Sequence, residues 1–136
     1  MRVMALDVGK RRIGVAVSDP LGITARPHST ILRDKKALDT ICAVVRDLHA
    51  ERIIVGLPLH LDGTEGEQAK DVRSFASKLA SRSIVPIEFC DERLTTVEAE
   101  ERLANRRGGW RKKKNRIDAL AAASILESYL NETRHL

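Results

Sequence analysis

The chain has 136 residues, of which 43% are hydrophobic and 32% are charged, and this size and composition predict one domain with one core. Its longest strictly apolar runs have five members, whereas a membrane span needs roughly 20. The sequence therefore excludes a transmembrane helix. Asp7 follows only four apolar residues, which excludes the apolar centre of a signal peptide and predicts a cytoplasmic protein.

The net charge of +5 comes from one segment of the chain. Residues 106–116 contain seven basic residues and no acidic one, so the remaining residues carry a net charge of −2. A local basic patch predicts a partner that carries phosphates, although a solvated loop would have the same composition. Cys42 and Cys90 are too few for a disulfide framework, and we expect both to be buried reduced thiols.

The N-terminal part of the chain is expected to form three strands. Residues 3–6 are a continuous apolar run that ends at Asp7-Val8-Gly9, and apolar residues then alternate with small ones over 13–17. These patterns predict a central strand and a second strand that packs closely against another element. A less regular third strand over 29–32 would complete an antiparallel meander.

A helix and a buried strand follow the meander. Apolar residues from Leu38 to Leu48 recur at helical spacing, and Asp34 precedes them as a candidate N-cap. Residues 52–57 (RIIVGL) are too apolar for a strand with one face in water. They predict a buried parallel strand and therefore a β-α-β unit.

Thr64 and Glu67 have the spacing of a capping box, which predicts a second helix ending near Ser81. A strand is expected over 85–90. Beyond it, the same capping spacing predicts a third helix over 95–107.

A basic loop is expected after this third helix, beginning at Gly108 and Gly109. Asn115 is expected to cap a final helix over 116–131. The alanines of that helix would let it lie close against the sheet.

This order of elements predicts an α/β fold in which helices flank a mixed five-stranded sheet. The first strand would lie between an antiparallel half and a parallel half. Ligands of such sheets bind at the carboxyl ends of the parallel strands. Asp7, Glu92 and Asp118 are all expected near that edge.

Carboxylates that meet at one edge repel one another and raise one another's pKa unless a cation lies among them. Oxygen ligands without His or Cys select Mg²⁺ or Mn²⁺. Two such ions could hold a phosphodiester, activate a water and stabilise the leaving oxygen. The sequence therefore predicts that Asp7, Glu92 and Asp118 bind metal and catalyse hydrolysis of a nucleic-acid backbone.

Each acidic residue also has an ordinary explanation. Asp7 could accept hydrogen bonds in a turn before Gly9. Glu92 could pair with Arg93 or Arg52 on the surface. Asp118, three residues after the expected cap, could simply stabilise the start of the last helix.

Four blocks of residues carry a family resemblance. They are 7–19 (DVGKRRIGVAVSD), 56–59 (GLPL) with 62–64 (DGT), 91–96 (DERLTT) and 118–123 (DALAAA). In order and spacing the chain resembles the YqgF/RuvX family. Members of that family are similar to RuvC-type Holliday-junction resolvases and have a ribonuclease-H-like fold.

The resemblance implies a single nuclease domain over 1–136 that matures the 5′ end of bacterial pre-16S ribosomal RNA, with an older assignment as a Holliday-junction resolvase. It maps the family's acidic triad onto Asp7, Glu92 and Asp118. Ala5 replaces a usual Gly, His60 stands where the family often has Asn, and the loop before Asp118 is unusually basic.

Basic residues at two places are expected to contact nucleic acid. Three follow the first strand, and the others surround the single tryptophan, which could stack on a base or fold back onto the core. The expected contacts are Lys10, Arg11, Arg12, Arg107, Trp110, Arg111, Lys112, Lys113 and Lys114.

Several alternatives stay open from the sequence. A resolvase acting on branched DNA would need two sites related by symmetry, and the residues announce no strong dimer, so we expect a monomer or a weak homodimer. A nucleic-acid-binding module without catalysis would leave the three acids structural. An actin-like ATPase shares the strand-Asp-x-Gly start but needs two such domains, which 136 residues do not supply.

Overall fold

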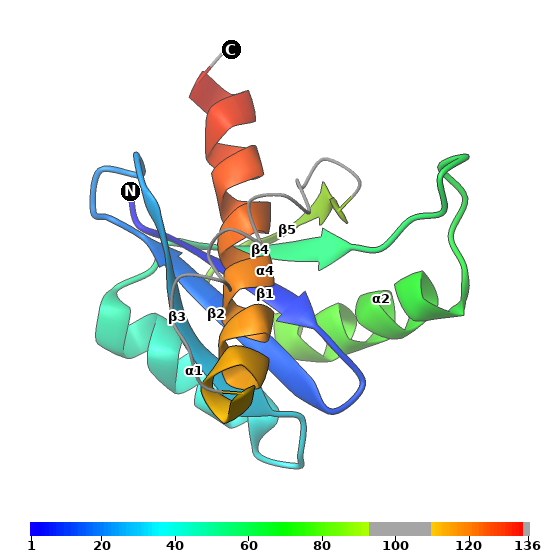
Figure 1. Ribbon diagram of the computed structural model, residues 1–136. Coiled ribbons are helices and arrows are strands. Elements are labelled where there is room, and N and C mark those ends of the chain that lie inside the picture. The colour runs from blue at the N-terminus through cyan, green and yellow to red at the C-terminus, as the bar shows by residue number, and fades with distance from the viewer. Residues whose placement is uncertain (93–109, 135–136) are drawn as a thin grey trace.

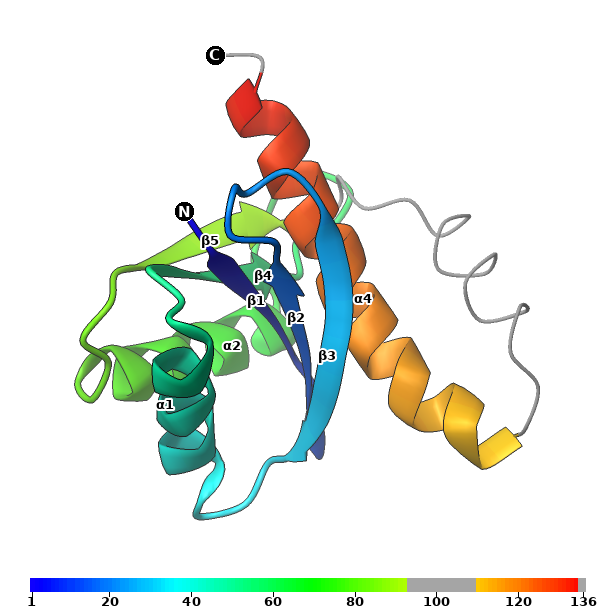
Figure 2. The same ribbon diagram turned by 90° about the vertical axis from the view of Figure 1, so that its left-hand side faces the viewer.

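The computed structural model describes residues 1–92 and 110–134, with side chains in the last helix described from Ile117 to Thr133. A five-stranded sheet in the order β3-β2-β1-β4-β5 carries helices on both faces (Figures 1 and 2). The strands are β1 (Val3–Val8), β2 (Arg12–Ser18), β3 (Ala25–Leu32), β4 (Arg52–Leu57) and β5 (Ile87–Asp91). The helices are α1 (Ala37–Leu48), α2 (Glu67–Ala80) and α4 (Trp110–Arg134).

The pairing of β1 confirms the predicted mixed sheet. β1 is antiparallel to β2 and parallel to β4, and β2 and β3 complete the antiparallel meander. β4 is parallel to β5. The carboxyl ends of β1, β4 and β5 therefore meet at one edge of the sheet.

Alternate residues of each strand enter two separate cores. Met4, Leu6 and Val8 of β1 pack with the apolar faces of α1 and α2. Val3 and Ala5 pack with alanines and leucines of α4 on the opposite face. The sheet thus separates the α1 and α2 layer from the α4 layer, as both ribbon views show.

The start of the last helix corrects the sequence analysis. Residues 110–114 were expected in a basic loop ahead of a cap at Asn115, but α4 is continuous from Trp110. No Gly or Pro occurs between 110 and 134, and Arg and Lys are good helix formers, so nothing in the local sequence ends the helix there. The helix expected over 95–107 lies outside the described residues.

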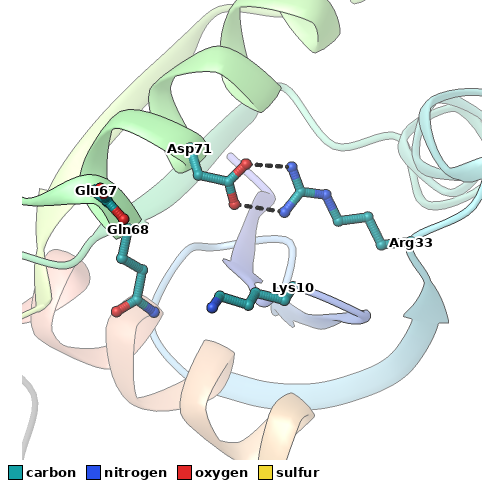
Figure 3. Close-up of a pocket in the computed structure, with 5 residues that line it drawn as sticks. All are labelled: Lys10, Arg33, Glu67, Gln68 and Asp71. Atoms are coloured by element: carbon teal, nitrogen blue, oxygen red, sulfur yellow. Dashed lines mark hydrogen bonds and ion pairs between the residues drawn. The ribbon is translucent and has the colours of Figure 1, made fainter.

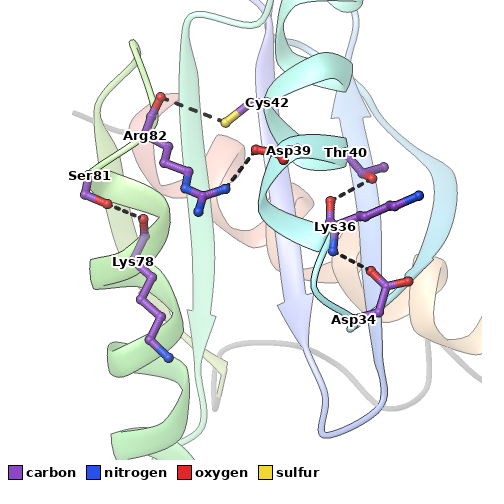
Figure 4. Close-up of polar contacts among 8 residues, drawn as sticks. All are labelled: Asp34, Lys36, Asp39, Thr40, Cys42, Lys78, Ser81 and Arg82. Atoms are coloured by element: carbon purple, nitrogen blue, oxygen red, sulfur yellow. Dashed lines mark hydrogen bonds and ion pairs between the residues drawn. The ribbon is translucent and has the colours of Figure 1, made fainter.

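Two predicted caps are also wrong, although both helices form. Asp34 Oδ1 accepts the backbone N–H of Lys36, and α1 begins one residue later without a side-chain cap (Figure 4). The hydroxyl of Thr64 donates to Asp62 Oδ1 instead of capping α2, whose cap position is Gly66. In both cases a nearer acceptor or donor satisfied the polar side chain.

The two cysteines differ from each other in burial. Cys90 is buried on β5, as predicted, but Cys42 on α1 is only partly buried. Its thiol faces the carbonyl oxygen of Arg82 (Figure 4).

In the described part of the chain, no helix has both the length and the apolar content that crossing a bilayer requires.

Candidate active site

Asp7 lies on the α4 face of the sheet, near the carboxyl end of β1. Val3 and Ala5 point into the core beneath α4, so the strand alternation places Asp7 on that same face. In the antiparallel pair, Asp7 lies opposite Gly14 of β2. Asp7 is partly buried, which is a costly place for an ionised carboxylate without a partner.

Glu92 follows β5 directly and lies over the neighbouring strand β4. A Cβ atom at Gly56 of β4 would stand 2.8 Å from Glu92 Oε1 and 3.0 Å from its Cγ. The missing side chain at Gly56 therefore leaves the space that Glu92 occupies. Arg52, one of its expected surface partners, contacts Tyr129 and Glu88 instead.

Asp118 reaches the site from α4, where the helix passes over β2. A Cβ atom at Gly14 would lie only 1.8 Å from the carbonyl oxygen of Asp118, so the helix backbone rests on this glycine. Asp118 stands eight residues after the start of α4 at Trp110. The expectation that it stabilises a helix start is therefore wrong.

The three carboxyl groups are electrostatic neighbours. Burial raises the pKa of Asp7, a side-chain hydrogen bond with Glu92 lowers it, and the charge of Asp118 raises it, for a net increase. A hydrogen bond between two carboxyl groups requires a proton on one of them. Asp7 therefore interacts with both Glu92 and Asp118.

Arg12 balances part of this charge. Its Nε donates to Asp118 Oδ2 over 2.9 Å, and both side chains are partly buried. Arg12 was expected to contact nucleic acid, and the structure shows it bound to an acidic residue of the predicted triad. Arg12 therefore neutralises part of the charge of Asp118, the carboxylate that also raises the pKa of Asp7.

The donor set suits a hard divalent cation, because Asp7, Glu92 and Asp118 offer only oxygen atoms. Among the described residues, no group of three His, Cys, Asp or Glu side chains is already spaced to hold an ion. A cation bound by all three would share the carboxylate of Asp118 with Arg12, whose Nε occupies only Oδ2. It would also require Asp7, whose pKa is raised, to be deprotonated, because metal ligands bind deprotonated.

The other expected nucleic-acid contacts are distributed differently. Lys10 and Arg11 are exposed at the turn between β1 and β2. Arg107 lies outside the described residues. The backbone of residues 110–114 forms the first turns of α4, which extend past the sheet (Figure 2).

A cavity among the described residues lies on the opposite face of the sheet from Asp7, Glu92 and Asp118. It has a volume of about 760 Å³ and is lined by Lys10, Arg33, Glu67, Gln68 and Asp71 (Figure 3). Arg33 holds Asp71 through two hydrogen bonds of 2.7 and 2.9 Å. Lys10 thus faces α2 whereas Arg12 faces α4, so the basic residues of one turn serve both faces of the sheet.

Two glycines make room for this site: the close packing predicted for the second strand is confirmed at Gly14, whereas the role of Gly56 was missed by the sequence analysis. Gly14 and Gly56 both lie within strands, where glycine often marks a close approach of another backbone or side chain. They make room for Asp118 and Glu92, respectively. A third close approach occurs at Gly9, where a Cβ atom would lie 2.7 Å from the carbonyl oxygen of Arg12.

Comparison with solved structures identifies the fold. The RuvC protein of T. thermophilus in complex with a Holliday junction substrate matches with a TM-score of 0.65 at 15% identity, covering 99% of this chain and 96% of that one. The fowlpox virus resolvase with Holliday junction DNA matches with a TM-score of 0.61 at 10% identity, covering 98% and 99%. The chain therefore has the ribonuclease-H-like fold of these resolvases.

Sequence comparison shows closer relatives. A protein of Anaeromyxobacter sp. (strain K), named as a pre-16S rRNA nuclease, is 44% identical over 133 residues, which cover 96% of this chain and 97% of the relative. A protein of the same name from Heliobacterium modesticaldum is 41% identical over 138 residues, covering 100% and 93%. The model of the family described as "RuvX: Holliday junction resolvase" matches residues 1–132. The chain therefore belongs to the RuvX family of nucleases.

Proposed function

We propose that this chain is a divalent-metal-dependent nuclease, a single domain over residues 1–136 that acts in the cytoplasm on the 5′ end of pre-16S ribosomal RNA. The names of its relatives support the substrate. The observation that supports the chemistry is the interaction of Asp7 with both Glu92 and Asp118, two residues that lie far from it in the sequence.

Asp7, Glu92 and Asp118 would hold Mg²⁺ or Mn²⁺, and the ions would supply an activated water and stabilise the leaving oxygen. Burial of Asp7 between the sheet and α4 keeps its carboxyl group oriented before substrate arrives. Gly14 and Gly56 fix the depth at which the other two carboxyl groups lie. Arg12, once released from Asp118, is placed to contact a phosphate at the same point.

The basic first turns of α4 are the second part of the proposal. Arg107, Trp110, Arg111 and Lys112 to Lys114 would contact the nucleic-acid strand as it approaches the carboxyl groups. Each phosphate contact on a single strand adds about −0.7 to the slope of log affinity against log salt. Replacing Lys112, Lys113 and Lys114 with Gln should therefore flatten the salt dependence of RNA binding by about two.

The decisive experiment compares cleavage and binding in the Asp7→Asn variant. A fragment that joins the 5′ leader to 16S rRNA is incubated with Mg²⁺ or Mn²⁺, and binding is measured by fluorescence anisotropy. The wild type should cleave the RNA fragment, and this cleavage should stop when EDTA is added. The Asp7→Asn variant should bind the fragment without cleaving it. Asp39→Asn is the matched control, because Asp39 is an exposed acid that pairs with Arg82 elsewhere.

Cleavage by Asp7→Asn at the wild-type rate would refute the proposed site. Binding without cleavage by the wild type, with every divalent ion tested, would favour a binding module in which the acids are structural.

A Holliday-junction resolvase is the second candidate, because the matched structures of this fold contain junction DNA. A synthetic four-way junction should be assayed beside the RNA fragment, and the mass in solution should be measured with each. A monomer or weak homodimer that cuts only RNA would support the first proposal. Paired cuts in the junction by a dimer would support the second.

A further inference from the structure

Leu61 is the most exposed large hydrophobic side chain in the described part of the molecule. It is 95% exposed and lies in the loop between β4 and α2. Scattered exposed leucines are ordinary on protein surfaces. The position of this one depends on the loop that carries it.

Hydrogen bonds brace the loop from both sides of its tip. Leu59 pairs with Glu65 in an antiparallel bridge, and the backbone N–H of His60 donates to the carbonyl oxygen of Thr64 over 2.9 Å. Asp62 Oδ1 accepts both the N–H and the hydroxyl of Thr64, at 2.9 and 2.6 Å. The loop is therefore a small ordered hairpin, and its fold holds Leu61 in the solvent.

The base of the loop is also anchored. Glu65 forms two hydrogen bonds with Arg73 of α2. A Cβ atom at Gly66 would lie 2.5 Å from the ring of His60, so the ring packs against this glycine. These contacts fix where the tip points relative to the sheet.

The loop leaves the sheet between the two strands that carry the carboxyl groups. β4 lies between β1, which holds Asp7, and β5, which leads into Glu92. Gly56, just before the loop, contacts Glu92 directly. The loop extends beyond this edge of the sheet (Figure 1). The loop therefore begins at the same edge of the sheet as the candidate site.

We infer that Leu61 packs against the nucleobases of the nucleic acid bound at the carboxyl groups and opens one base step near the scissile phosphate. The inference rests on the proposed function. Apolar side chains of this size are used as wedges between stacked bases in other nucleic-acid-binding proteins. A single leucine with polar neighbours offers too little apolar surface for a stable protein partner.

The neighbouring acid favours bases over phosphates as the contact. Hydrogen bonds from Thr64 lower the pKa of Asp62, so this carboxylate beside the tip stays ionised. A fixed negative charge repels the phosphodiester backbone. The bases are the part of the nucleic acid that an apolar tip beside an anion can approach.

The test uses RNA fragments in which 2-aminopurine replaces one base at a time around the cleavage position. Binding is measured in the Asp7→Asn background, where the proposed function predicts no cleavage. With Leu61 present, 2-aminopurine at the contacted step should brighten on binding because it is unstacked. Leu61→Ala should abolish that brightening at the same position and raise the Kd by about fivefold to tenfold.

Ile84 provides the matched control. It is 85% exposed and precedes β5, at the opposite edge of the sheet from the carboxyl groups. Ile84→Ala should leave both the fluorescence and the Kd unchanged. Thermal unfolding of both variants should match that of their parent, since neither side chain is buried.

The outcomes separate this inference from the proposed function. If Leu61→Ala binds and unstacks the bases as its parent does, the inference is overturned while the nuclease proposal stands. If the wild type neither binds nor cleaves the RNA and the junction, the proposed function fails first. Equal losses in Leu61→Ala and Ile84→Ala would also overturn the inference, because the effect would not depend on the place of the side chain.

Discussion

Arg12 and Asp118 join the turn between β1 and β2 to α4 through a single ion pair of 2.9 Å. The pair brings a guanidinium to within bonding distance of a carboxylate that the proposed function assigns to a metal ion. A divalent cation and Arg12 would therefore compete for the negative charge of the same carboxylate. A phosphate of the substrate would in turn compete for Arg12.

This competition predicts opposite effects of one substitution on two ligands. Arg12→Gln should tighten Mn²⁺ binding in the absence of nucleic acid by about fivefold, because a partly exposed ion pair contributes about 1 kcal/mol or less. The same variant should bind RNA more weakly. Isothermal titration calorimetry measures both. Arg11→Gln, an exposed neighbour, should leave Mn²⁺ affinity unchanged, and equal Mn²⁺ affinity in all three proteins would show that the ion pair does not compete.

The raised pKa of Asp7 predicts that this residue costs stability at neutral pH. Burial and the charge of Asp118 raise its pKa in the folded state, so the folded state is favoured while Asp7 is protonated and loses stability as the pH rises. The Asp7→Asn variant has no carboxyl group to ionise at this position, so it does not lose this stability as the pH rises. The variant should unfold at a higher temperature than the wild type at pH 7, and the difference should shrink below about pH 4, where the unfolded carboxyl group is also protonated.

A divalent ion should reverse the order of stability. At a concentration of one hundred times its Kd, Mn²⁺ should stabilise the wild type by about 2.7 kcal/mol. Asp7→Asn should gain much less. Thermal unfolding scans with and without Mn²⁺ give the comparison, and equal shifts in the two proteins would argue against Asp7 as a ligand.

Gly14 should not accept a side chain. Its Cβ atom would lie 1.8 Å from the backbone of Asp118, and overpacking of this kind costs about 1–3 kcal/mol or more because α4 must move. Gly14→Ala should therefore lower the free energy of unfolding, measured by urea denaturation, by at least about 1 kcal/mol. Gly66→Ala is the control, since its Cβ atom would meet only the side chain of His60, which can rotate away.

The two cysteines should differ in reactivity. Burial, with the charges of Glu132, Asp91 and Glu92, raises the pKa of Cys90 to about 11. The thiolate is the reactive form, so Cys90 should stay unmodified by iodoacetamide at pH 8 while partly buried Cys42 reacts. Peptide mass spectrometry measures both sites. Faster modification of Cys90 would show that β5 opens in solution.

The buried strands of the sheet could be predicted from hydrophobic patterning, whereas the more exposed β3 (Ala25–Leu32) is longer than the strand expected over 29–32. Residues 52–57 were expected as a buried strand, and β4 has those bounds. The apolar run and alternation after Val3 likewise predicted β1 and β2. Caps were predicted less well, because Asp34 and Thr64 each had more than one hydrogen-bond partner within a few residues.

The site could be predicted in its residue types but not in its contacts. Asp7, Glu92 and Asp118 were selected for their chemistry and their expected positions at one edge. The ion pair of Arg12 with Asp118 spans 106 residues, and no local pattern encodes a partner at that distance. The start of α4 was missed because a run of Arg and Lys residues has the composition typical of a loop, although both residue types have high helix propensity.

Because α4 is continuous, the distance along its axis between Trp110 and Asp118 is fixed. Trp110 and Asp118 belong to one uninterrupted helix, and eight residues at 1.5 Å each separate them by about 12 Å along its axis. A loop in the same place would let that spacing vary. Under the proposed function, a nucleic-acid strand bound at the start of α4 would therefore meet the carboxylate of Asp118 at a constant distance, and the length of this helical segment would set the cleavage position.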